Sequence, residues 1–249
     1  MPRATMAATL LLVLALTAGC SSSPDKPSGA AASAPAKNTS PLTGMSALEV
    51  WAKTKSDADA TKSVHVTGKF LDGEQKIGMD LKMTDAGKVF GVLTLNNDQI
   101  LVRRLGKTLY FKADRGFWTK NADAATATAL AGKWVKVKQG SSADLEQFFD
   151  LTDMDFIVSD VMSLSAAEQQ TLKLAPGVGI NHQKTVALVD ETTTEEAEVE
   201  TLYVSASDPA LPLHLAIGSD NSQFMKFRSW DKDFTVVAPE GAIDLAKAS

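Results

Sequence analysis

The sequence predicts an α+β protein in which a large, curved antiparallel β-sheet (a half-barrel) has helices packed on its concave face. Two blocks of segments that alternate apolar and polar residues are separated by a block with helical spacing. Within each block the segments recur every 8 to 12 residues or so with turn residues between them, as in an antiparallel meander. Because roughly ten strands are too many for a flat sheet, the sheet should curl.

The first 19 residues have the pattern of a cleavable secretory signal. Arg3 supplies a positive charge, and residues 6–18 form an apolar run, shorter than the roughly 20 residues that a permanent membrane helix needs. The only cysteine, Cys20, follows Leu16-Thr17-Ala18-Gly19. This arrangement resembles a bacterial lipobox and predicts that Cys20 becomes the lipid-modified (diacylglyceryl and palmitate) N-terminus. The alternative is an ordinary signal peptide with a chance cysteine.

Residues 20–43 are rich in Ser, Ala and Pro and contain almost no large apolar side chains. Such a segment cannot offset its ordering entropy by burial, so we expect a flexible tether. Two or more acyl chains on Cys20 would give stable anchoring. The sequence therefore predicts one folded domain, residues 44–249, held at the outer face of the cytoplasmic membrane in the cell envelope.

The domain should begin with a helix over residues 45–63, in which Leu48, Trp51, Ala52 and Ala58 fall near one face. The period then changes to two. Turn signals such as Leu71-Asp72-Gly73-Glu74 separate several of the alternating segments. The predicted strands of this first block are 64–70, 76–83, 88–95, 99–105, 107–113 and 133–138.

Residues 141–177 have helical spacing, with Ser165 and Glu168 placed as a capping box and Pro176-Gly177 at the end. Alternation then returns. Two hairpins are predicted, the first from 178–191 with 195–208 and the second from 213–220 with 222–230.

Composition excludes several classes of function. The 249 residues include 25 basic and 30 acidic side chains, a net charge of −5, which falls to −6 once Arg3 leaves with the signal. This balance gives no electrostatic footprint for nucleic acid. A single cysteine excludes an internal disulfide framework and a cysteine-rich zinc site.

A search for catalytic motifs predicts that the protein is not an enzyme and needs no cofactor or metal. The sequence contains no Gly-x-Ser-x-Gly elbow, no His-Glu-x-x-His and no Walker loop. His65, His182 and His214 each fall in a predicted strand, without metal-ligand spacing. An envelope hydrolase stays as a disfavoured alternative.

Two acidic clusters are candidates for a cation site or an acid–base site. Asp150, Asp153 and Asp155 lie in a connection between predicted helices, where Asp commonly caps a helix. In the second cluster, alternation places Glu196, Glu198 and Glu200 on one face, as in a solvated strand. Both clusters are better explained as structural, although cation binding at the first remains open.

Further segments carry a resemblance to a known family. After the lipobox-like segment, the tether and the helix comes Ser63-Val64-His65-Val66. Next comes a Gly-Lys-Thr-Leu-Tyr-Phe…Gly-Phe-Trp block over 106–118, and then Leu-Pro-Leu-His-Leu (211–215), which precedes the stretch 227–239. In order and rhythm the chain resembles the LppX/LprA/LprF/LprG-type actinobacterial lipoproteins, whose fold is similar to LolA and LolB. The acidic turn at 190–200 has no counterpart in that pattern.

The resemblance implies a half-barrel with an apolar cavity that holds lipid or glycolipid acyl chains and carries them within the cell envelope, with a membrane exporter as a possible partner. Helical Phe148, Phe149, Phe156 and Ile157 would form a lid. The predicted cavity walls are the inward-facing residues of the strands: Val64, Val66, Phe70, Ile77, Met79, Leu81, Met83, Leu109, Phe111, Leu213, Leu215 and Ile217.

The same residues could equally fill an ordinary packed core. The competing hypothesis is therefore a non-transporting interaction or sensor lipoprotein of the envelope, with a filled core and a protein partner.

Overall fold

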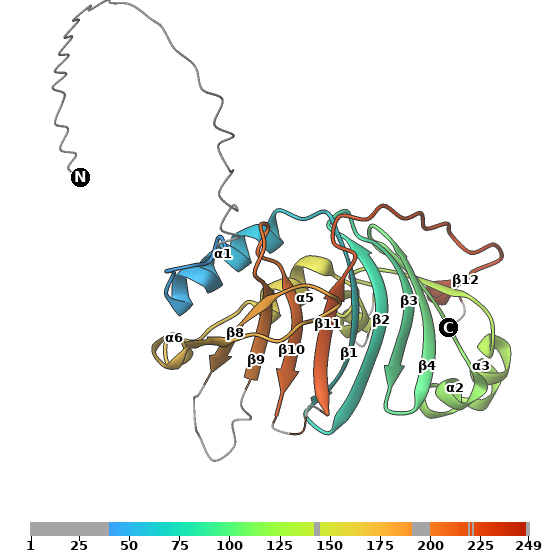
Figure 1. Cartoon of the computed structure of the whole chain (residues 1–249). Helices are drawn as coiled ribbons and strands as arrows, with labels where there is room; N and C mark the ends of the chain where they lie inside the picture. The colour runs from blue at the N-terminus through green and yellow to red at the C-terminus, as the bar shows by residue number, and fades with distance from the viewer. Residues whose placement is uncertain (1–39, 142–144, 191–199, 219, 221, 248–249) are drawn as a thin grey trace, which may run out of the picture. The chain divides into compact units, whose positions relative to one another are not determined.

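A single twelve-stranded sheet organises the domain, with the strand order β12-β6-β5-β4-β3-β2-β1-β11-β10-β9-β8-β7 (Figure 1). The computed structural model describes residues 40–141, 145–190, 200–218, 220 and 222–247. The strands are β1 (Ser63–Asp72), β2 (Gln75–Thr84), β3 (Lys88–Leu95), β4 (Asp98–Leu105), β5 (Thr108–Ala113), β6 (Val135–Lys138), β7 (Lys173–Pro176), β8 (Thr185–Asp190), β9 (Glu200–Ser205), β10 (Pro212–Ile217), β11 (Gln223–Arg228) and β12 (Ile243–Asp244).

Strand β1 joins the two blocks of the sheet. It pairs antiparallel with β2 on one side and with β11 on the other. The strands β1 to β6 form one meander and β7 to β11 the second, and β12 alone is parallel to its neighbour, β6. The outer strands β7 and β12 are not neighbours, so the curved sheet stays open. The predicted antiparallel half-barrel is confirmed.

In the described part of the chain, six α-helices accompany the sheet: α1 (Ala47–Asp59), α2 (Arg115–Asn121), α3 (Ala124–Leu130), α4 (Glu146–Asp150), α5 (Met154–Val161) and α6 (Glu168–Thr171). Figure 1 shows α5 behind β10 and β11. Within the described residues, none of these helices is long and apolar enough to span a membrane.

Side-chain hydrogen bonds define where several helices begin. Ser46 and Glu49 form a capping box at the start of α1. The predicted pair Ser165 and Glu168 makes the same reciprocal bonds ahead of α6. Asp153 caps α5 by accepting a hydrogen bond from the Phe156 amide.

The core lies between the sheet and the α4–α5 segment. In β2 the side chains of Ile77, Met79, Leu81 and Met83 are buried, while those between them are more exposed, as alternation requires. Phe111 of β5 stacks on Phe148 of α4, with ring centroids 6.0 Å apart. One face of the sheet therefore packs against helices through aromatic contacts.

Several predicted elements differ from those in the structure. The first helix ends at Asp59 and not at residue 63, and strand β8 begins at Thr185 and not at residue 178. Residues 173–176 form strand β7, paired with β8, although their spacing had been assigned to the helical block. Helices α2 and α3 were not predicted, because each has only seven residues and too few turns to show a period. Residues 40–43 belong to the domain and not to the tether, since Leu42 is buried and the Ser40 hydroxyl donates to the Ala206 carbonyl.

Candidate binding cavity

A buried arginine fixes the α4–α5 segment to the sheet. Arg104 of β4 is 5% exposed. Its Nη1 donates to the carbonyl oxygens of Phe149 and Thr152 at 2.9 and 3.0 Å, and its Nη2 lies 3.2 Å from an Asp153 carboxylate oxygen. Because these partners lie at the end of α4 and the start of α5, the guanidinium sets the position of both helices above the strands.

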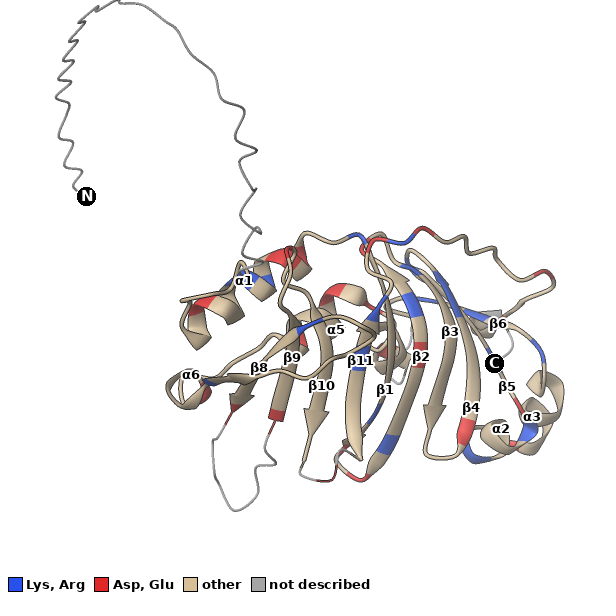
Figure 2. Ribbon diagram, viewed as in Figure 1, with Lys and Arg blue, Asp and Glu red and all other residues tan. Residues whose placement is uncertain are grey.

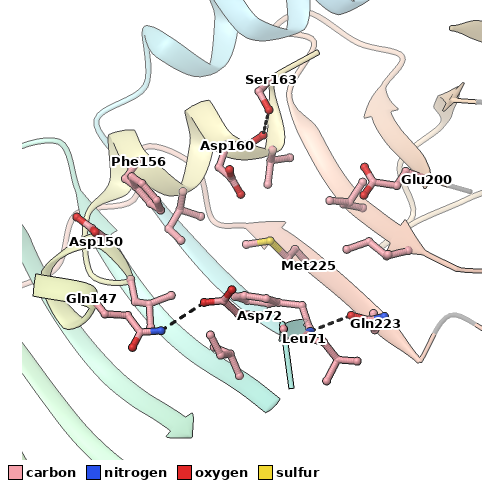
Figure 3. Close-up of a pocket in the computed structure, with 18 of the residues that line it drawn as sticks. Leu71, Asp72, Gln147, Asp150, Phe156, Asp160, Ser163, Glu200, Gln223 and Met225 are labelled. Carbon is pink, nitrogen blue, oxygen red and sulfur yellow. Dashed lines mark hydrogen bonds between the residues drawn. The ribbon is translucent and has the colours of Figure 1, made fainter. Parts of the chain in front are cut away.

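A cavity of about 880 Å³ lies between this segment and the sheet (Figure 3). This volume is within the range of roughly 300 to 1,000 Å³ found for small-molecule pockets. The apolar lining comes from the α4–α5 connection, from α5, from the β1–β2 hairpin and from strands β10 and β11. Its members are Phe70, Leu71, Ile77, Leu151, Phe156, Ile157, Val161, Leu215, Ile217 and Met225.

Carboxylates surround the apolar lining. In Figure 3, Asp150 and Asp160 of the helical segment, Asp72 of β1 and Glu200 of β9 lie around the space beside Met225. The other acidic lining residues are Glu168 and Asp190. Figure 2 shows acidic residues on α5 and at the adjoining ends of β8 and β9, whereas β11 carries lysine and arginine and β2 carries both lysine and aspartate. The cavity therefore combines an apolar interior with an acidic mouth.

The predicted wall residues separate into three groups. Phe70, Ile77, Leu215 and Ile217 line the cavity. Leu213 lines a separate recess beside Phe227 and Trp230. The remaining wall residues lie in the main packed core and outside the cavity lining: Val64, Val66, Met79, Leu81, Met83, Leu109 and Phe111.

The predicted lid residues lie on the two helices that cover the sheet. Phe156 and Ile157 of α5 line the cavity, and Phe156 is 46% exposed. Phe148 and Phe149 of α4 are buried in the core instead. A ligand role for any wall or lid residue remains a prediction.

Sequence reasoning missed Arg104 and the acidic mouth. Arg104 shares its strand parity with Ile100 and Val102, both of which face the core. A charge at an inward position of an alternating strand is the signal that identifies it. The acidic residues of the mouth come from six different elements, so sequence spacing does not bring them together.

The histidines lie apart from the cavity. His65 Nε2 is 2.6 Å from an Asp80 carboxylate oxygen, and Arg228 contacts the same ring. His214 stacks on Tyr203 with centroids 5.8 Å apart, and burial, together with the charge of Lys226, lowers the pKa of its imidazole. His182 lies in a turn, not in the strand that was predicted.

The cluster Asp150, Asp153 and Asp155 has separate structural roles. Asp153 caps α5 and pairs with Arg104, while Asp150 lies at the mouth of the cavity. Burial, reinforced by the charges of Asp153, Asp85 and Asp59, raises the pKa of Asp155. Within the described ranges there is no group of three or more His, Cys, Asp or Glu residues that could hold a metal ion.

Several predictions fall outside the described residues. The signal sequence, Cys20 and most of the tether lie within residues 1–39. Of the second acidic cluster, only Glu200 is described, and it is exposed at the start of β9. Anchoring through Cys20 therefore remains a prediction.

No family model matches the chain, and no curated protein matches it. Among solved structures, LprF from Mycobacterium bovis aligns with a TM-score of 0.51 and 16% identity, over 78% of this chain and 97% of LprF. The lipoprotein LppX from Mycobacterium tuberculosis aligns with a TM-score of 0.47 and 14% identity, over 77% of this chain and 98% of LppX. The likeness to LprF confirms the resemblance at the level of the fold: this chain has the fold of LprF.

Proposed function

We propose that the protein is a lipoprotein of the cell envelope that binds lipid acyl chains in the cavity between α5 and the sheet and carries them within the envelope. The observation that carries this proposal is the cavity of about 880 Å³ with its apolar lining. Burial of chain methylenes there would supply affinity at roughly 25 cal/mol per Å². The LprF fold is consistent with it.

The proposal includes anchoring of the mature chain through acylated Cys20 at the outer face of the membrane. The tether would let the domain reach both the membrane and a partner such as an exporter. Holding acyl chains in a cavity requires no catalytic group, so the function that we propose is that of a carrier and not of an enzyme.

The alternative is a non-transporting interaction or sensor lipoprotein. It is favoured by the tight packing of seven of the predicted wall residues in the core and outside the cavity lining. Exposed Leu71 and Phe156 would then contact a protein partner. The two functions differ in what occupies the cavity.

Native mass spectrometry of the whole chain carrying Cys20→Ser, incubated with envelope lipid extract, tests the proposal. A bound mass of lipid size is expected for this protein and should be lost in Ile217→Trp, which fills the cavity. Leu101→Trp is the matched control, because Leu101 is 43% exposed on β4 and outside the cavity lining. A clean unliganded mass while a control carrier loads would contradict the carrier function and favour the alternative.

A further inference from the structure

We infer that the outer face of the sheet, the side away from α5, docks on the anionic head groups of a membrane surface. The inference goes beyond the proposed function, because it needs neither the cavity nor a bound acyl chain. It follows from the charge of this face, from lysines without a carboxylate partner in the described part of the chain, and from the apolar side chains among them.

Cross-strand register gathers basic side chains on the outer face at the centre of the sheet. His65 of β1 lies opposite Arg228 of β11 and Lys82 of β2, and directly opposed side chains lie on the same face. Figure 2 views this side of the sheet and shows lysine and arginine on β2 and β11. In β11, β1 and β2 the basic side chains on this face are Lys69, Lys76, Lys82, Lys226 and Arg228.

The charges of these lysines are not neutralised locally. Lys69, Lys76 and Lys226 are exposed, and within the described residues none of them forms an ion pair with a carboxylate. Among the described side chains on this face of β11, β1 and β2, only Asp80 is acidic, and it lies 2.6 Å from His65 Nε2. The face is therefore positive although the whole chain has a net charge of −5.

Apolar side chains lie among the lysines. Phe224 is half-buried, and the Nζ of Lys226 lies 4.7 Å from the centroid of its ring. Leu101 of β4 is 43% exposed on the same face, opposite Lys112. Lysine charges beside aromatic and aliphatic side chains suit the boundary between anionic head groups and acyl chains. A second copy of the same face would be repelled by its like charge.

The segment that follows β11 limits the area available for docking. Residues 229–242 cross one end of the outer face, where Phe234 packs edge-on against Phe90 with ring centroids 5.4 Å apart. Lys69 and Lys76 lie at the other end of their strands, beside the β1–β2 turn. The free part of the face therefore lies between this segment and that turn.

Charge would also orient the docked domain. The cavity lies on the α5 side of the sheet, and its lining includes six acidic side chains and, among the described residues, no lysine or arginine. An anionic surface therefore attracts one side of the sheet and repels the other. Docking through the outer face leaves α5 and the cavity accessible to a partner.

A polarity-sensitive dye at a single position of the whole chain tests the inference. Cys20→Ser removes the only cysteine, so one new cysteine can carry the dye. Leu101→Cys places the dye on the outer face, and Ser159→Cys places it at an exposed position of α5 as the matched control.

The dye at position 101 should shift to the blue on vesicles of dioleoyl phosphatidylglycerol and stay unshifted on vesicles of dioleoyl phosphatidylcholine. The dye at position 159 should stay unshifted on both. The apolar run of residues 6–18 can bring the chain to either kind of vesicle, so the difference between the vesicles isolates the charge. Raising the salt to about 1 M should reduce the shift.

Neutralising three lysines assigns the docking to this face. Lys69→Gln, Lys76→Gln and Lys226→Gln together should lower the ratio of docked to undocked chain by about a hundredfold, since each basic side chain near an anionic surface contributes roughly fivefold. The control removes the same charge from exposed lysines outside the free part of the face and should lower the ratio by less than about threefold: Lys107→Gln, Lys120→Gln and Lys184→Gln.

Every other pattern of shifts contradicts the inference. A shift at position 159 in place of 101 would show that the opposite side docks. Equal shifts at position 101 on both kinds of vesicle would show that charge does not drive docking. A shift with inorganic polyphosphate but with no vesicle would make the occupant a soluble polyanion. None of these results bears on acyl-chain binding, which native mass spectrometry measures separately.

Discussion

The two halves of the sheet are built from the same alternating pattern, yet one is filled and the other is hollow. In the filled half, which runs from β2 to β6 and reaches the cavity through Ile77 at the start of β2, inward residues such as Leu81, Ile100 and Leu109 are 0% exposed. In the hollow half, β9 to β11 with the end of β1, Leu215, Ile217 and Met225 face α5 across the cavity. The pattern of a strand therefore fixes which side chains point inward, but not what they meet there.

The difference comes from the position of the helices. Arg104 and the Phe111–Phe148 stack hold the start of the α4–α5 segment against the filled half. Farther along, α5 crosses the hollow half, where Ile157 and Val161 contribute to the cavity lining. Aromatic residues pack directly against the filled half of the sheet. The hollow half is covered by α5, with the cavity between them.

The largest effect is expected from Gly91→Ala in the filled half. Gly91 of β3 has a φ of +152°, and an added Cβ would lie 2.0 Å from the Asp80 carbonyl oxygen of the neighbouring strand. Backbone atoms cannot yield cheaply, so we expect the free energy of unfolding to fall by about 4 kcal/mol or more. Urea denaturation measures this free energy of unfolding.

Gly106→Ala is the control. The φ of Gly106, +59°, is strained for alanine, but nothing lies within 4 Å of the added Cβ, so the free energy of unfolding should fall by roughly 1 to 3 kcal/mol. Equal losses would show that β3 is not packed as described.

Truncating one inward side chain in each half of the sheet tests whether one half is filled and the other hollow. Leu81→Ala leaves a void in a close-packed region and should lower the free energy of unfolding by roughly 2 to 5 kcal/mol. Ile217→Ala enlarges a space that already exists, so a loss of about 1 kcal/mol is expected. The two variants are compared by urea denaturation. A loss at Ile217 as large as that at Leu81 would mean that the hollow half is packed after all.

The fold was predictable because its signals are local. Period-two alternation, turn residues and helix caps identified most elements, and the capping box at Ser165 and Glu168 was confirmed. The short helices α2 and α3 lacked a readable period, and β7 gains its identity from pairing with β8. These elements depend on tertiary contacts that a sequence window does not contain.

The cavity was only partly predictable. Phe70, which lines the cavity, and Val66, which packs in the core, both lie at inward positions of β1. The alternation of a strand indicates which way a side chain points, but not how far away the opposite layer lies. The acidic mouth required the fold to bring Asp72, Asp150 and Glu200 together. Arg104 was the one part of the site with a local signal, a charge at an inward strand position.

Arg104→Met should loosen the attachment of α4 and α5 to the filled half. The change leaves the carbonyls of Phe149 and Thr152 without their charged donor, so we expect about 2 kcal/mol lower stability. Arg103→Met is the control, because Arg103 lies on the other face and its guanidinium donates to the Val237 carbonyl at the surface; its cost should be under about 1 kcal/mol. Hydrogen exchange of the α5 amides should accelerate in Arg104→Met alone. Equal exchange rates of the α5 amides in both variants would show that Arg104 does not position α5.

The smallest effect concerns pH on the outer face of the hollow half. Burial lowers the pKa of His214, and Lys226, its cross-strand partner, acts in the same direction. The folded state then binds this proton less readily than the unfolded state, so stability is complete above the unfolded pKa of about 6.5 and falls as pH drops through 6.5 toward the lower folded value. Urea denaturation between pH 7.5 and 5 should show a shallower slope in His214→Phe, which keeps a ring stacked on Tyr203 without a titrating group. Because nothing in the cavity changes, lipid binding by that variant should equal that of the parent at pH 7.5. An unchanged slope would mean that His214 is more hydrated than its packing between Tyr203 and Phe224 indicates.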